Sequence, residues 1–144
     1  MIDAVTSMIQ LVPAGSGVVF ENTRICTGRT VRHEAGSTRF VLLAPGIYSV
    51  HFNGNIAVPT GETVGPVSVA LSVDGESVTG TDAIITPAAV EEYGNVSISS
   101  LVRVYGCGNC PANVGVTVVN TSDIPINVQD ANLVIIRECG GGVA

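Results

Sequence analysis

The pattern of apolar and polar positions is clearest over residues 47–58, where the two kinds of residue alternate almost without a break. The apolar set is Tyr48, Val50, Phe52, Ile56 and Val58, and the polar set is Ser49, His51, Asn53 and Asn55. Successive side chains of a β-strand point to opposite faces, so this spacing predicts a long strand with one face on a core. Gly54 interrupts the apolar set, which predicts a bulge or a close backbone approach there.

Shorter segments of the same kind recur along the chain, separated by turn residues. The further strands predicted are residues 17–25, 30–34, 38–43, 67–73, 77–85, 96–105, 114–118, 124–128 and 132–137. Asp74-Gly75 stands between two of them and is a strong signal for a two-residue hairpin. Many short strands at regular spacing are typical of an all-β sandwich or barrel, and no helical period is evident after residue 12.

The last predicted strand, residues 132–137, differs from the others because it does not alternate. Leu133 and Ile135 point to one face, and Val134 and Ile136 point to the other. A strand in an antiparallel sandwich has only one face on the core, so the second apolar face needs a different cover. A partner subunit is the simplest cover, and Val134 and Ile136 are therefore predicted to lie in a subunit interface.

The first 14 residues form a separate segment in this interpretation. Ile2, Val5, Ile9 and Val12 follow a spacing that fits a short helix, although a segment this short is marginal as an isolated helix. The alternative is an extended arm. The predicted organisation is thus an N-terminal segment over residues 1–14, one β domain over residues 15–139 and a glycine-rich tail over residues 140–144.

The composition adds a reason to expect subunit contacts. Apolar residues make up 46% of the chain and charged residues only 12%, against about 25% charged in an ordinary soluble domain. The mean hydropathy is +0.48, yet no apolar run approaches the roughly 20 residues that a membrane helix needs. Membrane insertion is therefore not expected, and the apolar surplus is assigned to contacts between copies.

Charge and the N-terminal sequence bear on partners and location. The net charge is −6, there is no lysine, and the six arginines are scattered singly, so no basic patch for nucleic acid is present. The first ten residues lack the basic and long apolar regions of a secretory signal. Placement outside a cell would then follow lysis or assembly into a particle.

Cys107 and Cys110 form the sharpest chemical signal, a Cys-x-x-Cys spacing. A redox pair usually stands at a helix N-terminus, whereas this one lies between two predicted strands. A zinc site needs four ligands, which Cys26 and Cys139 would complete only if the fold gathered them. We favour structural thiols or disulfides. Four cysteines allow three pairings, which stay open, and no metal or cofactor is expected.

Catalytic constellations are not evident elsewhere. His51, with Asn53, would line either a polar ligand groove or a subunit interface, and the interface is the favoured interpretation. Glu91 and Glu92 are adjacent, so on an extended chain their carboxylates point apart and do not form the pair of a glycosidase. The serines at 68, 72, 97 and 99 would bind carbohydrate or form the wet or intersubunit face of a sheet. The chain is not expected to be an enzyme.

Three motifs in order carry a family resemblance. They are Phe40 followed by Ala44-Pro-Gly-Ile-Tyr48, then Val69-Ala-Leu-Ser-Val-Asp-Gly75, then the terminal Leu133-Val-Ile-Ile-Arg-Glu138. Residues 15–139 resemble the tumour necrosis factor-like jelly roll, and more closely complement-type globular heads. They also look like the heads of bacterial spore-surface collagen-like glycoproteins and small prophage-encoded proteins. No Gly-X-Y stalk precedes the segment, and the calcium-binding residues of some relatives have no counterpart.

The resemblance implies a two-sheet antiparallel jelly-roll sandwich of about ten strands, assembled as a homotrimer without enzymatic activity. The expected function is a structural or recognition protein of a phage or prophage particle, such as a fibre head, decoration or receptor-binding module on the virion surface. The expected partners are further copies, other particle or surface proteins, and a glycan or host-surface receptor. The alternatives are a spore- or cell-surface adhesin-like domain and a carbohydrate-binding module. The trimer-interface candidates are Val134, Ile136, His51 and Asn53.

Overall fold

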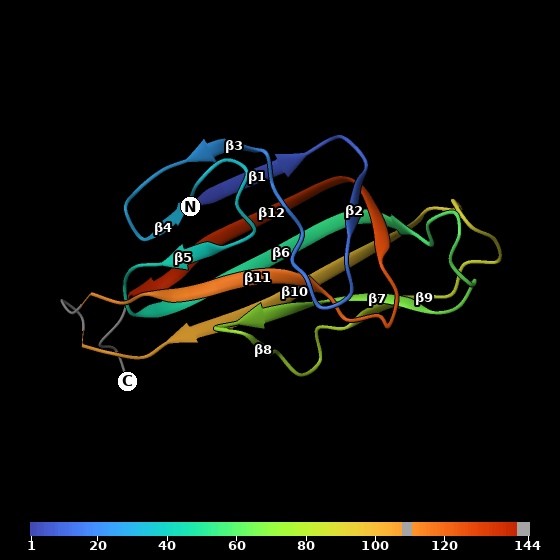
Figure 1. The fold of residues 1–144 in the computed structure, drawn as a ribbon. Helices are drawn as coiled ribbons and strands as arrows, with labels where there is room; N and C mark the ends of the chain where they lie inside the picture. Colours follow the sequence, from blue (N-terminus) through green and yellow to red (C-terminus); the bar gives the residue numbers. More distant parts are fainter. Residues whose placement is uncertain (108–110, 141–144) are drawn as a thin grey trace.

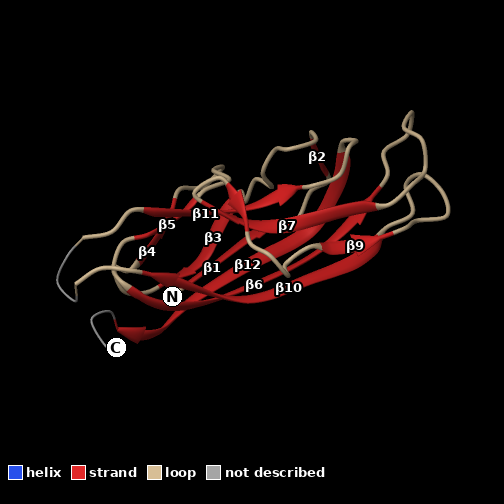
Figure 2. Cartoon of the chain, turned by 90° about the horizontal axis from the view of Figure 1, so that it is seen from below, coloured by secondary structure: helices blue, strands red, loops and turns tan. Residues whose placement is uncertain are grey.

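The computed structural model describes residues 1–107 and 111–140, and over these residues it contains strands and no helix. The strands form two antiparallel sheets that pack face to face, as the two layers in Figure 2 show. The first sheet has the order β10-β6-β12-β1-β3, with β2 added to β12, and the second has the order β4-β5-β11-β7-β8, with β9 added to β7. The predicted two-sheet sandwich is confirmed.

The three longest strands, β6, β10 and β12, are neighbours in the first sheet (Figure 1). This sheet contains β1 (Ile2–Thr6), β2 (Gln10–Val12), β3 (Asn22–Cys26), β6 (Gly46–Ala57), β10 (Gly94–Val104) and β12 (Ile126–Gly140). The second contains β4 (Val31–His33), β5 (Phe40–Leu42), β7 (Val67–Val73), β8 (Glu76–Ser77), β9 (Ala83–Ile85) and β11 (Val114–Asn120). Strand β6 pairs with β10 on one side and β12 on the other.

The core lies between the sheets and is built from the apolar sets predicted above. Tyr48, Val50, Phe52 and Ile56 of β6 are at most 1% exposed, and Leu133 and Ile135 of β12 are fully buried. The Tyr48 hydroxyl donates to the carbonyl of Ala44 at 2.7 Å, which satisfies the one polar atom of this side chain. The apolar and polar residues of β6 therefore alternate because one face of the strand lies in the core and the other lies outside it.

An aromatic cluster joins the two sheets. The Phe20 ring meets Phe40 and Phe52 edge to face, with centroids 5.4 and 6.4 Å apart. His33 stacks on Phe40 at 4.1 Å, with its two ring nitrogens near the Thr23 hydroxyl and the Ser37 carbonyl. His33 is thus a packed structural side chain.

The N-terminal segment is extended and not helical, which agrees with the second of the two predicted alternatives. Residues 2–6 form β1, which lies between β12 and β3, and residues 10–12 form β2 on the edge of β12. Ile2, Ala4 and Thr6 are at most 1% exposed and Asp3 is 8% exposed, whereas Ile9 is 53% exposed. Hydrogen bonds to β12 and β3 pair the backbone groups of β1. A helix this short is marginally stable by itself, so the strand is favoured. The β-sandwich therefore begins at residue 2, and not at residue 15.

The C-terminal end also differs from the prediction. The two strands expected at residues 124–128 and 132–137 form one strand, β12, with an irregularity between Gln129 and Asn132. Asp130 has a φ of 52°, and two residues here oppose the single Gly54 of β6, which defines a β-bulge. Gly140, assigned above to the tail, is the last residue of β12 and pairs with Gly46 of β6. Residues 141–144 lie outside the described part of the chain.

The hairpin predicted at Asp74-Gly75 is present between β7 and β8. Both residues have positive φ, 50° and 88°, as a type I′ turn requires. The Asp74 carboxylate accepts a hydrogen bond from the Gly115 backbone at 2.8 Å, which ties the turn to β11. The return strand expected over residues 77–85 is divided into the short strands β8 and β9. Over the described residues, no helix is long and apolar enough to cross a membrane.

Candidate functional site: the outer face of the first sheet

The four predicted interface residues lie on one face of the first sheet. In the register, His51 of β6 stands opposite Val134 of β12 and Ser99 of β10, and Asn53 stands opposite Asn132 and Ser97. Directly paired residues share a face, and the alternate residues of β6 point into the core. This set of side chains therefore points away from the second sheet, and we call the surface the outer face.

One half of the outer face, which we call the apolar half, carries its large apolar side chains around a hydrogen bond from Ser49 to Glu138 at 2.6 Å. Val134 and Ile136 are partly buried, and Leu101 on the edge strand β10 is 66% exposed opposite Ser49. Tyr105, just past β10, is 79% exposed, with the Arg103 guanidinium 5.0 Å from its ring centroid. An isolated protomer leaves these side chains in contact with water.

The other half of the outer face carries a ladder of amides and hydroxyls. Asn95 of β10 donates to the side-chain oxygen of Asn53 at 2.9 Å, and Ser97 donates to the same oxygen at 3.3 Å. The Ser99 hydroxyl lies 3.0 Å from Nδ1 of His51. These cross-strand bonds fix the orientation of the polar side chains and leave the amide nitrogen of Asn53 without a hydrogen bond in the described part of the chain.

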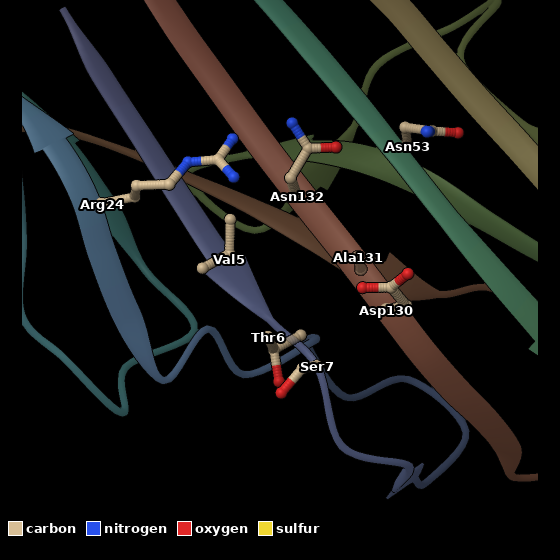
Figure 3. A pocket seen from close by; sticks show the side chains of 8 residues that line it. All are labelled: Val5, Thr6, Ser7, Arg24, Asn53, Asp130, Ala131 and Asn132. Carbon is tan, nitrogen blue, oxygen red and sulfur yellow. The ribbon is translucent and has the colours of Figure 1, made fainter.

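A depression lies beside this ladder, where β1, β12 and β6 run side by side (Figure 3). Its volume is about 440 Å³, and it is lined by Val5, Thr6, Ser7, Arg24, Asn53, Asp130, Ala131 and Asn132. Figure 3 shows Asn132 between Val5 and Asn53, with Asp130 further along β12 at the bulge. The depression thus combines a small apolar surface with amide, hydroxyl, carboxylate and guanidinium groups.

An ion pair stands at the margin of the depression. The Arg24 guanidinium donates to Oδ2 of Asp3 from Nη2 at 2.5 Å and from Nε at 3.0 Å. Asp3 is only 8% exposed, and its second oxygen, Oδ1, has no hydrogen-bond partner among the described residues. The hydroxyl of Thr6, which is 1% exposed, is likewise without a partner in that part of the chain. Two buried oxygens of β1 are therefore unsatisfied by the described residues, and one of them, the Thr6 hydroxyl, belongs to a residue that lines the depression.

Only two of the four cysteine side chains, Cys26 and Cys107, are described, and they are in different states. Cys26 is a free, exposed thiol at the end of β3, and Cys107, after β10, is in a disulfide bond. Cys110 lies outside the described residues, and the side chain of Cys139 is not described. Within residues 1–107 and 111–140, no three potential ligands of the His, Cys, Asp or Glu types stand together. The structure thus excludes Cys26 as the disulfide partner of Cys107.

The other candidate residues separate onto different surfaces. Ser68 and Ser72 belong to the second sheet and Ser97 and Ser99 to the first, so the four serines do not form one surface. Glu91 is an exposed turn residue, as predicted, and it accepts hydrogen bonds from the Thr60 backbone at 3.0 Å and the Asn127 amide at 3.1 Å. It links the loop at Thr60 to β12.

Sequence reasoning missed most residues of the depression. Thr6 comes from the segment predicted as a short helix or extended arm, Arg24 from the predicted strand 17–25, and Asp130 from between two predicted strands. The available signal was Asp130 itself, a polar residue with a tolerance for positive φ between two apolar runs, which is typical of a bulge. Only Asn53 was selected from its place on the polar side of β6.

Comparison with known proteins identifies the fold. No protein-family model matches the sequence, and no curated protein matches it. Among solved structures, Eiger TNF from S. frugiperda has a TM-score of 0.68 at 10% identity, covering 94% of this chain and 91% of that chain. Murine APRIL has a TM-score of 0.62 at 10% identity, covering 92% and 97%. Pika GITRL has 0.53 at 13% identity, covering 96% and 98%. The chain therefore has the tumour necrosis factor-like jelly-roll fold that the sequence motifs predicted.

Proposed function

We propose that the protein is a non-enzymatic recognition head that assembles as a homotrimer through the apolar half of the outer face of its first sheet. The observation that carries the proposal is the apolar half of that face. Val134 and Ile136 sit in its middle, and Leu101 is exposed on its edge strand. Burial of such side chains contributes about 25 cal/mol per Å² of apolar surface, which favours association. The jelly-roll fold and the low charge of the chain support the same conclusion.

The polar contacts of the outer face support binding over catalysis. The Ser99 hydroxyl and Nδ1 of His51 lie 3.0 Å apart. These are two of the three groups found in a serine hydrolase, the nucleophile and its general base. A hydrolase also needs a third group that orients the imidazole through its other nitrogen. Nε2 of His51 has no such partner among the described residues, so the pair is interpreted as a cross-strand contact.

The resemblance of the sequence to prophage-encoded proteins extends the proposal to location. The trimer would be a component of a phage or prophage particle, as a fibre head, a decoration or a receptor-binding module. A spore- or cell-surface adhesin-like domain is the second candidate. Electron micrographs of particles labelled with an antibody to this chain test the first, and label confined to spores or cell envelopes would support the second instead.

The assembly is tested by charge substitutions on the two sheets. Leu101→Asp changes an exposed residue, so the protomer should fold, and Ile136→Asp changes the middle of the face. Both should convert a trimer into monomers, because a carboxylate in an apolar interface loses its hydration. Ile84→Asp is the matched control, since Ile84 is 63% exposed on β9 of the second sheet. Association that is unchanged in the folded Leu101→Asp protein would contradict the proposed interface.

A further inference from the structure

The depression on the outer face contains more hydrogen-bonding capacity than the protomer uses. Within the described residues, the side chains of Ser7, Asp130 and Asn132 make no hydrogen bond, and the Thr6 hydroxyl is buried without a partner. Buried polar groups in native proteins are nearly always paired, so an unpaired one beside an open depression indicates a missing polar group. That group belongs to a bound molecule or to ordered water.

The local backbone shows how the depression is built. The bulge at Asp130 and Ala131 inserts an extra residue opposite Gly54, and Ala131 is 3% exposed while Asp130 is exposed. A side-chain carbon on Gly54 would lie 3.0 Å from Cβ of Ala131, so glycine is what lets the bulged strand approach β6. Bulges commonly redirect a side chain toward a site, and here the redirected side chain is the carboxylate of Asp130.

The kinds of group present select the class of ligand. Arg24 is already neutralised by Asp3, so Asp130 leaves the surroundings of the depression with a net negative charge, which disfavours phosphates and acidic sugars. A metal ion is disfavoured because no cluster of three suitable ligands exists in the described part of the chain. Asn53 and Asn132 offer amides, Asp130 offers strong acceptors, and Val5 and Ala131 offer an apolar surface. Adjacent sugar hydroxyls need this mixture of donors and acceptors, and the C–H faces of a sugar ring need the apolar surface.

We propose that this depression is a binding site for a neutral saccharide, with Asp130, Asn132 and Asn53 as its polar contacts. The site names the ligand class of the recognition head and rests on the proposed function for its biological role. Its residues all come from one protomer, so binding itself does not require assembly. The site is on the polar half of the outer face, separate from Leu101 and Ile136.

The test uses the full chain on an array of immobilised neutral oligosaccharides, followed by calorimetric titration with the saccharide that binds best. Asn132→Ala and Asp130→Asn should each weaken the affinity at least tenfold. The second keeps a residue that tolerates the φ of 52° at this position. Asn113→Ala, at an exposed asparagine on the link to β11, is the control and should bind like the wild type.

Light scattering on the same samples separates this proposal from the trimer. A silent array, or equal affinities for the wild type, Asn132→Ala and Asp130→Asn, overturns the saccharide site whatever the assembly. If the wild type is a monomer that binds a saccharide, and Asn132→Ala and Asp130→Asn abolish that binding, the site is confirmed and only the trimer is contradicted.

Discussion

Ala131 on β12 packs directly over Gly54 on β6, so that a side-chain carbon on Gly54 would lie 3.0 Å from Cβ of Ala131 and 2.9 Å from Cζ of Phe52. These distances are shorter than carbon atoms tolerate without movement. The close approach predicted from Gly54 in the sequence is therefore real. It is also what lets the bulge of β12 lie against β6.

The first prediction concerns this contact. Gly54→Ala should destabilise the protein by about 1–3 kcal/mol, because the methyl group overpacks a buried contact between two long strands. Urea unfolding followed by circular dichroism measures the change. Gly65→Ala is the control, since a carbon there meets nothing within 4 Å, and it should leave stability nearly unchanged. Equal stability of the two variants would show that the strands separate at little cost.

The second prediction concerns the hydroxyl of Tyr48. Burial raises the pKa of this phenol above its ordinary value, because the phenolate is poorly solvated in the core. The unfolded chain loses the proton near pH 10, whereas the native state keeps it. The stability contributed by Tyr48 is therefore complete below about pH 10 and is lost as the pH rises through the native pKa.

Urea midpoints between pH 8 and 11 measure this effect. The wild type should lose stability above pH 10 more steeply than Tyr48→Phe, which should itself be about 1 kcal/mol less stable at pH 8 without the bond to Ala44. Tyr105→Phe, at an exposed position, is the control and should retain the wild-type slope. Tyr93, whose pKa is also raised by burial and by Glu91, contributes equally in all three proteins. Parallel pH profiles for the wild type and Tyr48→Phe would contradict the assignment.

The third prediction concerns Asn120, which is fully buried at the end of β11. Its amide nitrogen donates to the carbonyls of Val12 at 3.1 Å and Ile124 at 2.9 Å, so it joins β11 to β2 and to the loop that precedes β12. Asn120→Ala should cost about 3 kcal/mol, because it leaves buried carbonyls without donors. Asn113→Ala, at an exposed position, should cost much less. A change below 1 kcal/mol for Asn120→Ala, measured by urea unfolding, would mean that water replaces the amide.

The fourth prediction concerns the cysteines. Iodoacetamide added to the native protein should modify the exposed thiol of Cys26, whereas Cys107 should react only after reduction. Peptide mapping by mass spectrometry identifies the modified positions. Modification of Cys107 without a reducing agent would contradict the disulfide.

The alternating strands were predictable from the sequence because a single physical cause fixes them. Strand β6 has one face in the core, and the period of its apolar residues matches the pleat of a strand. The same reasoning found the two-faced apolar pattern of Leu133 through Ile136, and the structure places Leu133 in the core and Ile136 on the outer face.

The N-terminus and the depression were not predictable in this way. The spacing of Ile2, Val5 and Ile9 fits a helix, but β12 and β3 offer backbone partners that local sequence does not reveal. The depression joins Thr6, Arg24 and Asp130 through strand pairings and a bulge, which depend on contacts far apart in the chain. Sequence patterns identified the faces of strands and could not identify which faces meet.

The mass of the native protein in dilute buffer, measured by size-exclusion chromatography with light scattering, tests the central claim most directly. The proposed assembly predicts about three times the 14.7 kDa of one chain for the wild type and for Ile84→Asp, and about 14.7 kDa for Leu101→Asp. A wild-type protein that elutes as a 14.7 kDa monomer at every concentration would contradict the trimer.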